Sequence, residues 1–172
     1  MIDNMVDDIV NDVDDQAAPP DAVGFVLPLL LLAGFRQLVD DLHAELARRG
    51  HPGMRPTYGF AMQAVGAGGA TATEVGQRLG ISKQAAGKTV DRLELLGYVA
   101  RSGDPLDARR KRVRLTPQGL EVLEASAEIF DTLRGQWAKT LGGQRVRALE
   151  DDLRRMTGAT GIPLDVAGWL GG

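Results

Sequence analysis

The segment from Gln84 to Gly97 reads QAAGKTVDRLELLG, and its first half can be interpreted in two ways. The letters GKT end the phosphate-binding loop of many nucleotide-using enzymes, but they also fit one turn of an amphipathic helix. A phosphate-binding loop needs Gly-x-x-x-x-Gly-Lys-Ser/Thr after a strand. Its first glycine would fall at Ser82, and a helical pattern precedes the segment in place of a strand. The sequence therefore predicts a helix here and no phosphate-binding loop.

At about 100° per residue, this helix has an apolar half and a polar, basic half. The apolar half consists of Ala85, Ala86, Thr89, Val90, Leu93 and Leu96. The polar half consists of Lys83, Gln84, Gly87, Lys88, Asp91 and Arg92. Glutamine can make paired hydrogen bonds with adenine, and lysine can bind guanine or phosphate. Gly87 lies among these side chains, where it either lets DNA approach closely or is a tolerated surface residue.

A shorter helix is predicted just before this one. Thr71 and Glu74 have the spacing of a capping box, which favours a helix that begins there and runs to Leu79. Gly80 can supply the left-handed residue that ends it, and Ser82 is a suitable cap for the next helix. Two helices joined by a short turn that contains glycine have the layout of a helix-turn-helix.

A basic hairpin is predicted after the second helix. Residues 98–101 fit a strand, residues 102–110 are rich in turn formers, and apolar and basic residues alternate over residues 111–115. We therefore expect two short strands with a basic tip between them. Thr116 and Pro117 are a typical helix cap and first helical residue.

Further helices are expected on both sides of this central unit. Residues 22–49 carry apolar residues at helical spacing, which predicts a long helix there, and the apolar run within it is interpreted as a buried helix that begins near Pro28. Residues 56–65 fit a shorter helix. Residues 117–141 and 146–156 carry long, narrow apolar stripes. These stripes would leave apolar surface uncovered on one small domain, which favours packing between two chains.

Composition narrows the possible kinds of site. The chain has 172 residues with no cysteine, so disulfides and thiolate metal sites are excluded. With only His43 and His51, a metal site would need several carboxylates, and we expect two partly exposed histidines, no metal and no cofactor. The sequence contains no nucleophile–base pair or phosphate loop, so an enzyme is not expected.

The apolar run at residues 24–35 raises the question of a membrane. It has 12 residues and includes a proline, whereas a span needs about 20 apolar residues. The acidic segment before it is unlike the positive start of a signal peptide. We therefore expect no membrane association and a cytoplasmic, nucleoid-associated protein.

Charge is unevenly distributed along the chain. The formal net charge is −3, yet residues 71–115 carry ten basic and five acidic residues. Such a basic segment within an acidic chain favours a surface for a polyanion. Residues 1–21 contain seven aspartates and no basic residue, which predicts a disordered acidic tail. That tail either solubilises the protein or competes with DNA for the basic surface.

The stretch from Thr71 to Leu123 resembles the MarR family of winged-helix transcription regulators. The segments DRLELLGYV and DPLDARRKRVRLTPQG carry the resemblance, and the flanking helices extend it to residues 22–157. It implies a mainly α fold with a small β-wing. The implied domains are a winged helix-turn-helix at residues 54–116, dimerisation helices at residues 22–50 and 117–160, and tails at residues 1–21 and 161–172.

The resemblance also implies a function. The chain would form a homodimer that binds a palindromic operator in double-stranded DNA, with one helix in the major groove and the wing in the minor groove. The implied DNA-binding residues are Ser82, Lys83, Gln84, Gly87, Lys88, Arg92, Arg109, Arg110 and Lys111. Asp107 would orient Arg109 through an ion pair.

A small aromatic or apolar acid is the implied ligand, and its binding would change DNA affinity in a regulator expected to be a repressor. The candidate ligand-pocket residues are Phe35, Arg36, His43, Tyr58, Phe60, Met62 and Trp137. The alternative is a winged-helix protein-interaction module, or an anti-regulator, that does not bind DNA.

Overall fold

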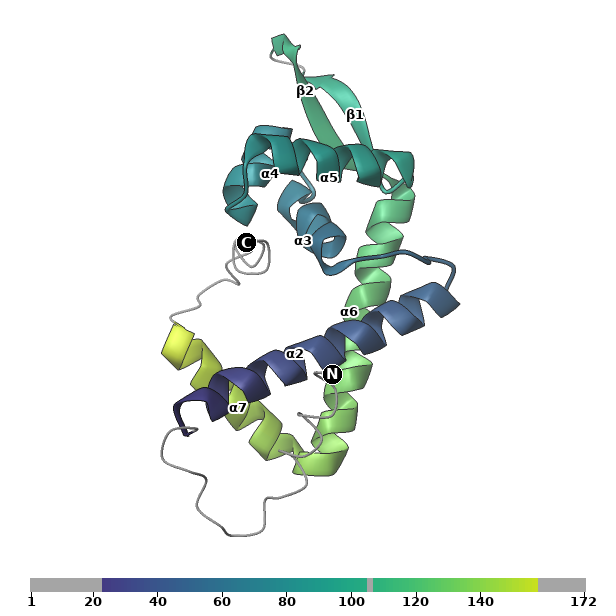
Figure 1. The fold of residues 1–172 in the computed structure, drawn as a ribbon. Helices are drawn as coiled ribbons and strands as arrows, with labels where there is room; N and C mark the ends of the chain where they lie inside the picture. The colour runs from purple at the N-terminus through teal and green to yellow at the C-terminus, as the bar shows by residue number, and fades with distance from the viewer. Residues whose placement is uncertain (1–22, 105–106, 158–172) are drawn as a thin grey trace, which may run out of the picture. The chain divides into compact units, whose positions relative to one another are not determined.

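The computed structural model describes residues 23–104 and 107–157, and the side chains of Val23 and of residues 104–110 are not among those described. Within that part the protein is mainly helical with one two-stranded sheet (Figure 1). The elements are α2 (Val23–Arg48), α3 (Pro56–Val65), α4 (Ala72–Leu79), α5 (Lys83–Leu95), β1 (Val99–Asp104), β2 (Asp107–Leu115), α6 (Pro117–Leu141) and α7 (Gly143–Thr157). This agrees with the predicted fold class. The chain divides into two compact units, Met1–Gln37 and Leu38–Gly172.

The first unit contains the N-terminal part of α2. The helix predicted over residues 22–49 is confirmed, because α2 covers Val23–Arg48. Pro28 lies inside this helix, so the other expectation, of a start near Pro28, is wrong. Proline at this position removes one backbone hydrogen bond, to Gly24, and the leucines that follow it are strong helix formers. The side chains of Phe25, Leu27 and Leu30 are more than half exposed. The expected burial of this segment is therefore not found within a single chain.

The second unit has a hydrophobic core between the end of α2 and the helix-turn-helix. The side chains buried most completely include Leu46, Met62, Leu79, Leu93 and Val122. They come from five helices, α2 to α6, so the core fixes the helix-turn-helix to the longer helices of this unit. None of the helices in the described residues combines the length and apolarity that a membrane span requires.

Helices α4 and α5 form the predicted helix-turn-helix. The backbone N–H of Glu74 donates to the Thr71 hydroxyl at 3.2 Å, and the backbone N–H of Thr71 donates to the Glu74 carboxylate at 2.7 Å. This is the predicted capping box. Gly80 ends α4 with a φ of 67°, and Ser82 caps α5 by accepting from the backbone N–H of Ala85 at 3.2 Å. The predicted caps are confirmed.

The hairpin is longer than predicted. Antiparallel pairing of β1 with β2 joins Ser102 to Arg112 and Gly103 to Lys111, so Ser102 and Gly103, which were expected to lie in the turn, belong to β1. Ladder hydrogen bonds continue the strands through residues that prefer turns locally. At the base of the hairpin, Ala70 and Val113 exchange two backbone hydrogen bonds of 3.0 and 2.8 Å. Figure 1 shows the hairpin projecting beyond α4 and α5.

His51 is buried, which corrects the expectation of two partly exposed histidines. Its side chain is 6% exposed, and its Nδ1 lies 3.2 Å from the hydroxyl of Tyr98. After α2 the chain turns back, and the backbone N–H of His51 bonds to the Leu46 carbonyl at 2.8 Å. Burial raises the pKa of the Tyr98 hydroxyl, which therefore stays neutral and can share a hydrogen bond with the ring.

Candidate nucleic-acid interface

The outer face of α5 is exposed and basic. Ala86, Val90 and Leu93 form its buried side. The residues of this helix and its cap that were predicted to bind DNA directly through side chains are all exposed: Ser82, Lys83, Gln84, Lys88 and Arg92. The free N–H groups of the first turn add a partial positive charge next to Lys83. The face therefore offers both hydrogen-bond donors and positive charge to an anion.

Two small residues on α5 clarify the helical wheel. Ala85 was placed in the apolar half but is exposed, because it lies in the first turn, where the neighbouring residues also face solvent. Gly87 is half-buried, and a Cβ added there would meet no atom within 4 Å. Packing within the protein does not require glycine at this position.

The wing brings a second lysine, Lys111, close to Lys83 at the start of α5. Lys111 and Lys83 line the same surface groove of about 550 Å³. The other lining residues, Thr71 to Glu74 and Gln77, come from the start and middle of α4. The wing and both helices of the helix-turn-helix therefore meet at one groove that carries two lysines.

The side chains of Asp107, Arg109 and Arg110 lie outside the described residues, although their backbone belongs to β2. The expected ion pair between Asp107 and Arg109 stays a prediction. Closer to the hairpin base, the Arg112 Nη2 donates to the Gly69 carbonyl at 3.3 Å.

Arg101 joins the wing to α5, which the sequence analysis missed. Its guanidinium donates to Asp91 at 2.5 Å and also to the Glu94 carboxylate, and its backbone N–H donates to Glu94 at 3.0 Å. Partial burial lowers the pKa of Arg101, but the hydrogen bonds to both carboxylates raise it overall. This basic residue is therefore paired within the protein. The available signal was a pair of carboxylates three residues apart on the helix, followed by an arginine on the next strand.

The seven candidate ligand-pocket residues occupy different surroundings. Phe35 and Arg36 belong to the first unit, and the other five belong to the second. Met62 is fully buried in the hydrophobic core, and Tyr58 and Phe60 are partly buried and pack against that core. Burial lowers the pKa of half-buried His43, and the nearby Asp40 carboxylate opposes this shift.

Trp137 lines an apolar groove of about 320 Å³ between α6 and α7, and none of the other six residues lines it. The ligand pocket built from these seven residues therefore stays a prediction. In the described part of the chain, no group of three or more metal-binding side chains could hold a metal ion.

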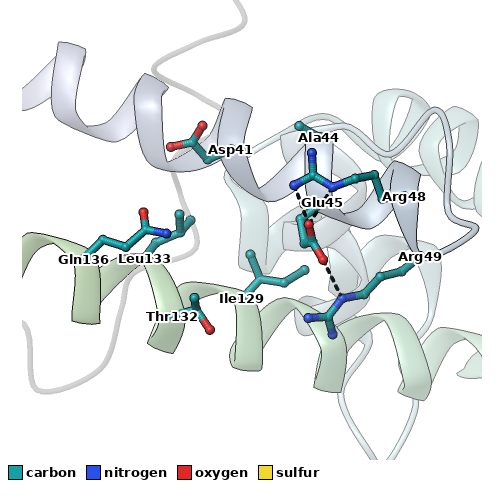
Figure 2. A pocket seen from close by; sticks show the side chains of 9 residues that line it. All are labelled: Asp41, Ala44, Glu45, Arg48, Arg49, Ile129, Thr132, Leu133 and Gln136. Carbon is teal, nitrogen blue, oxygen red and sulfur yellow. Dashed lines mark hydrogen bonds and ion pairs between the residues drawn. The ribbon is translucent and has the colours of Figure 1, made fainter.

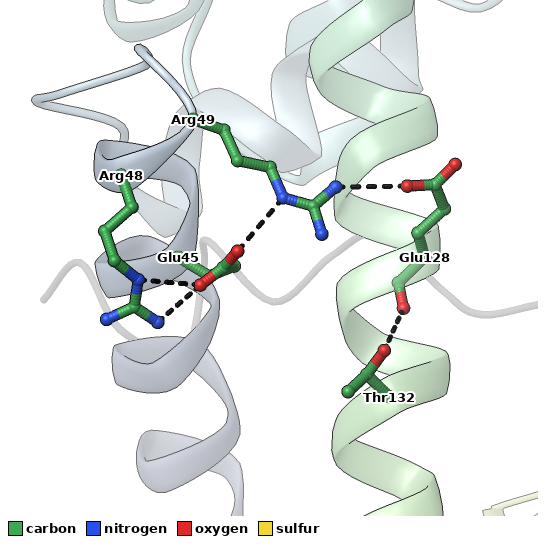
Figure 3. Close-up of polar contacts among 5 residues, drawn as sticks. All are labelled: Glu45, Arg48, Arg49, Glu128 and Thr132. Atoms are coloured by element: carbon green, nitrogen blue, oxygen red, sulfur yellow. Dashed lines mark hydrogen bonds and ion pairs between the residues drawn. The ribbon is translucent and has the colours of Figure 1, made fainter.

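A polar groove of about 350 Å³ lies between the end of α2 and α6 (Figure 2). Glu45 accepts hydrogen bonds from Arg48 and Arg49 on its wall, and these bonds lower the pKa of Glu45. Arg49 also donates to Glu128 on α6 at 3.0 Å, as Figure 3 shows. This chain of charges ties the two helices together at the surface. Arg49 and Glu128 are 79 positions apart in the sequence, so the helical pattern around either residue did not indicate that they pair.

The chain is similar to known proteins in its fold. A family model described as MarR family matches residues 53–110, and no curated protein matches the chain significantly. A MarR-family transcriptional regulator from Rhodococcus sp. RHA1 has a TM-score of 0.60 and 21% identity, covering 86% of this chain and all of its own.

Two further similar structures contain a bound molecule. A mutant of Staphylococcus aureus MepR bound to an oligodeoxyribonucleotide has a TM-score of 0.55 and 19% identity, with 79% of this chain and 99% of that one covered. CouR from Rhodococcus jostii RHA1, bound to p-coumaroyl-CoA, has a TM-score of 0.58 and 21% identity, with 80% and 95% covered. These likenesses establish the fold. The family match covers the helix-turn-helix and part of the wing, and the structural neighbours include MarR-family transcriptional regulators, so the chain is similar to that family.

Proposed function

We propose that the protein is a homodimeric regulator that binds a palindromic operator in double-stranded DNA, represses transcription and changes its DNA affinity when a small molecule binds. The observation that carries this proposal is the exposed basic face of α5 beside the lysine-lined groove at the wing. The letters GKT at residues 87–89 lie inside α5 and do not form a phosphate-binding loop at the end of a strand.

The chemistry of α5 suits the major groove of DNA, which admits one helix. Gln84 is exposed near the N-terminus of the helix, where it can reach the edge of an adenine. Lys83 and Lys88 can bind guanine acceptors or phosphate oxygens. On the wing, Lys111 together with Arg109 and Arg110 would supply contacts to the backbone or to the minor groove.

Dimerisation would give the protein two DNA-binding units, each with its own α5 and wing. Exposed apolar side chains on α2, α6 and α7, such as Leu30, Phe130 and Leu153, provide surface for a second copy to cover. A two-fold axis places the two helices on half-sites about one helical turn apart, roughly 10 base pairs. This predicts a palindromic operator. The MepR structure with its oligonucleotide supports DNA as the partner.

Ligand control is proposed from the family and from the apolar and aromatic side chains near the core. The CouR structure with p-coumaroyl-CoA supports small-molecule binding in this fold. We propose a small aromatic or apolar acid, bound near the seven candidate residues from Phe35 to Trp137. The cytoplasm, at the nucleoid, is the proposed place of action.

The proposal is tested by selecting DNA from a random pool with the full-length protein. The selected sites should be palindromic, and binding measured by fluorescence anisotropy should weaken steeply as salt increases, because phosphate contacts release counterions. A scrambled duplex of the same length is the control. A library of aromatic acids can then be screened for release of the selected duplex. Absence of any sequence preference would favour the alternative of a protein-interaction module.

A further inference from the structure

We propose that Arg101 is a positioning residue that sets the distance and angle between the β-wing and the recognition helix α5. This inference rests on the proposed DNA-binding function and adds to it a residue that acts through other groups, without contacting DNA. In this inference, one ion-paired arginine fixes how far the DNA contacts of the wing lie from those of the helix.

Three contacts join Arg101 on β1 to the middle of α5. One arm of the guanidinium reaches Asp91 at 2.5 Å, the other reaches the Glu94 carboxylate, and the backbone N–H of Arg101 bonds to Glu94 at 3.0 Å. The planar fork of arginine can hold two carboxylates at fixed angles, which a lysine ammonium cannot do. The Arg101 side chain is only 24% exposed, so solvent screens these contacts less than at an open surface.

The position of Arg101 along the hairpin makes it an anchor. Its ladder partner is Val113, which is buried and bonded to Ala70 in front of α4. The base of the hairpin is therefore held on β2 by the Ala70 bridge and on β1 by the arginine. The next pairs along the ladder, Ser102 with Arg112 and Gly103 with Lys111, lead outward to the part proposed to reach DNA. A small rotation at the base would become a larger displacement at the tip.

The same face of α5 carries both the anchor and a DNA contact. Glu94 follows Lys83 by 11 residues, which is close to three helical turns, so both point to one side of the helix. Lys83 lines a groove with Lys111 of the wing. Binding groups are effective only when supporting residues hold them within a fraction of an ångström of the productive geometry. The ion pairs of Arg101 supply that support for the spacing between the two lysines.

The first arm of the test uses the free protein and needs no DNA. Amide hydrogen exchange is compared in the wild type, Arg101→Ala and Arg114→Ala. Arg114 is the matched control, because it is an arginine on β2 paired with the residue before Arg101. We expect exchange at Ser102, Gly103 and Lys111 to be about tenfold faster in Arg101→Ala and unchanged in Arg114→Ala, with both variants folded by circular dichroism. Unchanged exchange in Arg101→Ala would overturn the anchor.

The second arm measures binding to the selected palindrome over a range of salt concentrations. Arg101→Ala should bind about tenfold more weakly, and Arg101→Lys should lie between it and the wild type. In the double variant Glu94→Arg with Arg101→Glu the pair with Glu94 is reversed and the net charge is kept, but Asp91 still faces the new carboxylate, so the double variant should bind more tightly than Arg101→Glu alone without reaching the wild type. The salt dependence should remain that of the wild type, whereas Lys111→Ala should reduce its slope by about one.

The competing explanation is direct contact between Arg101 and a phosphate. It predicts that the double variant binds no more tightly than Arg101→Glu and that the salt slope of Arg101→Ala falls by about one, and that result would overturn the proposal. If the wild type shows no sequence preference for DNA, the proposed function fails and the role of Arg101 in DNA reading fails with it. The exchange experiment still decides whether Arg101 anchors the wing, so the two failures are distinguishable.

Discussion

At Gly87, the structure separates the cost of a glycine from any benefit it has in binding. A Cβ at this position meets no atom within 4 Å, while glycine inside a helix costs about 1 kcal/mol relative to alanine. We expect Gly87→Ala to raise the free energy of unfolding by about 0.5–1 kcal/mol and to weaken binding to the selected operator, because the new methyl group would face the DNA in the proposed complex. Urea unfolding and anisotropy measure the two effects. Stabilisation without any loss of binding would mean that Gly87 is a tolerated surface residue.

The buried pair of His51 and Tyr98 predicts a stability effect at another single residue. Tyr98→Phe removes the hydroxyl that lies 3.2 Å from the ring nitrogen and leaves that nitrogen without this partner in a buried place. We expect the free energy of unfolding to fall by about 1–3 kcal/mol, measured by urea denaturation. Tyr58→Phe is the matched control on a half-buried tyrosine, and an equal loss in both variants would argue against the hydrogen bond as the cause.

Long-range side-chain partners are the part of the site that the sequence could not predict. His51 and Tyr98 are separated by 47 positions, and nothing in the local pattern around either residue points to the other. The pairing of Arg101 with Asp91 and Glu94 likewise depends on how β1 returns along α5. The exposure of Lys83, Gln84 and Lys88, in contrast, followed from helical periodicity alone.

At the scale of elements, helix ends were predicted well and strand ends were not. The limits of α4 and α5 depend on Thr71, Gly80 and Ser82, whose side chains or backbone act within four residues of themselves. The lengths of β1 and β2 depend on ladder bonds between strands, which turn-forming residues such as Gly103 do not prevent. At Pro28, the loss of one hydrogen bond was too small to end a helix with so many strong helix formers.

The start of α4 should make stability depend on pH. The Glu74 carboxylate accepts a hydrogen bond from the Thr71 N–H, and this hydrogen bond lowers the pKa of Glu74 below its usual value of about 4.5. Because the folded pKa is the lower one, the stabilisation is present above about pH 4.5 and is lost as the pH falls through the folded value. Glu74→Gln should therefore lose less stability than the wild type between about pH 5 and 3.

Urea denaturation across that pH range measures the effect, with Glu121→Gln as a control. Glu121 is an exposed carboxylate on α6, and its substitution changes the net charge by the same amount. A pH profile that Glu74→Gln and Glu121→Gln alter equally would show that overall charge, and not the capping box, governs acid stability.

For the whole molecule, the exposed apolar part of α2 predicts that one chain is not the functional unit. Leu27, Leu30 and their apolar neighbours keep a large share of their surface exposed in the single chain, a pattern that soluble monomers avoid. If a second copy covers this surface, Leu30→Glu places a charge in the interface and should convert the dimer to a monomer. Sedimentation analysis measures this change. Operator affinity should fall with it, because a monomer loses the gain from binding two half-sites together.

Leu95→Glu is the matched control for this experiment. Leu95 is also an exposed leucine, but it lies at the end of α5, which is not one of the helices proposed to dimerise. It should sediment as the wild type does. A Leu30→Glu protein that remains dimeric would place the interface elsewhere, on α6 and α7, whose exposed Leu149 and Met156 would then be the next residues to test. A wild type that sediments as a monomer at every concentration would contradict the proposal that a dimer binds both half-sites of a palindrome. A single chain has only one α5 to place in the major groove.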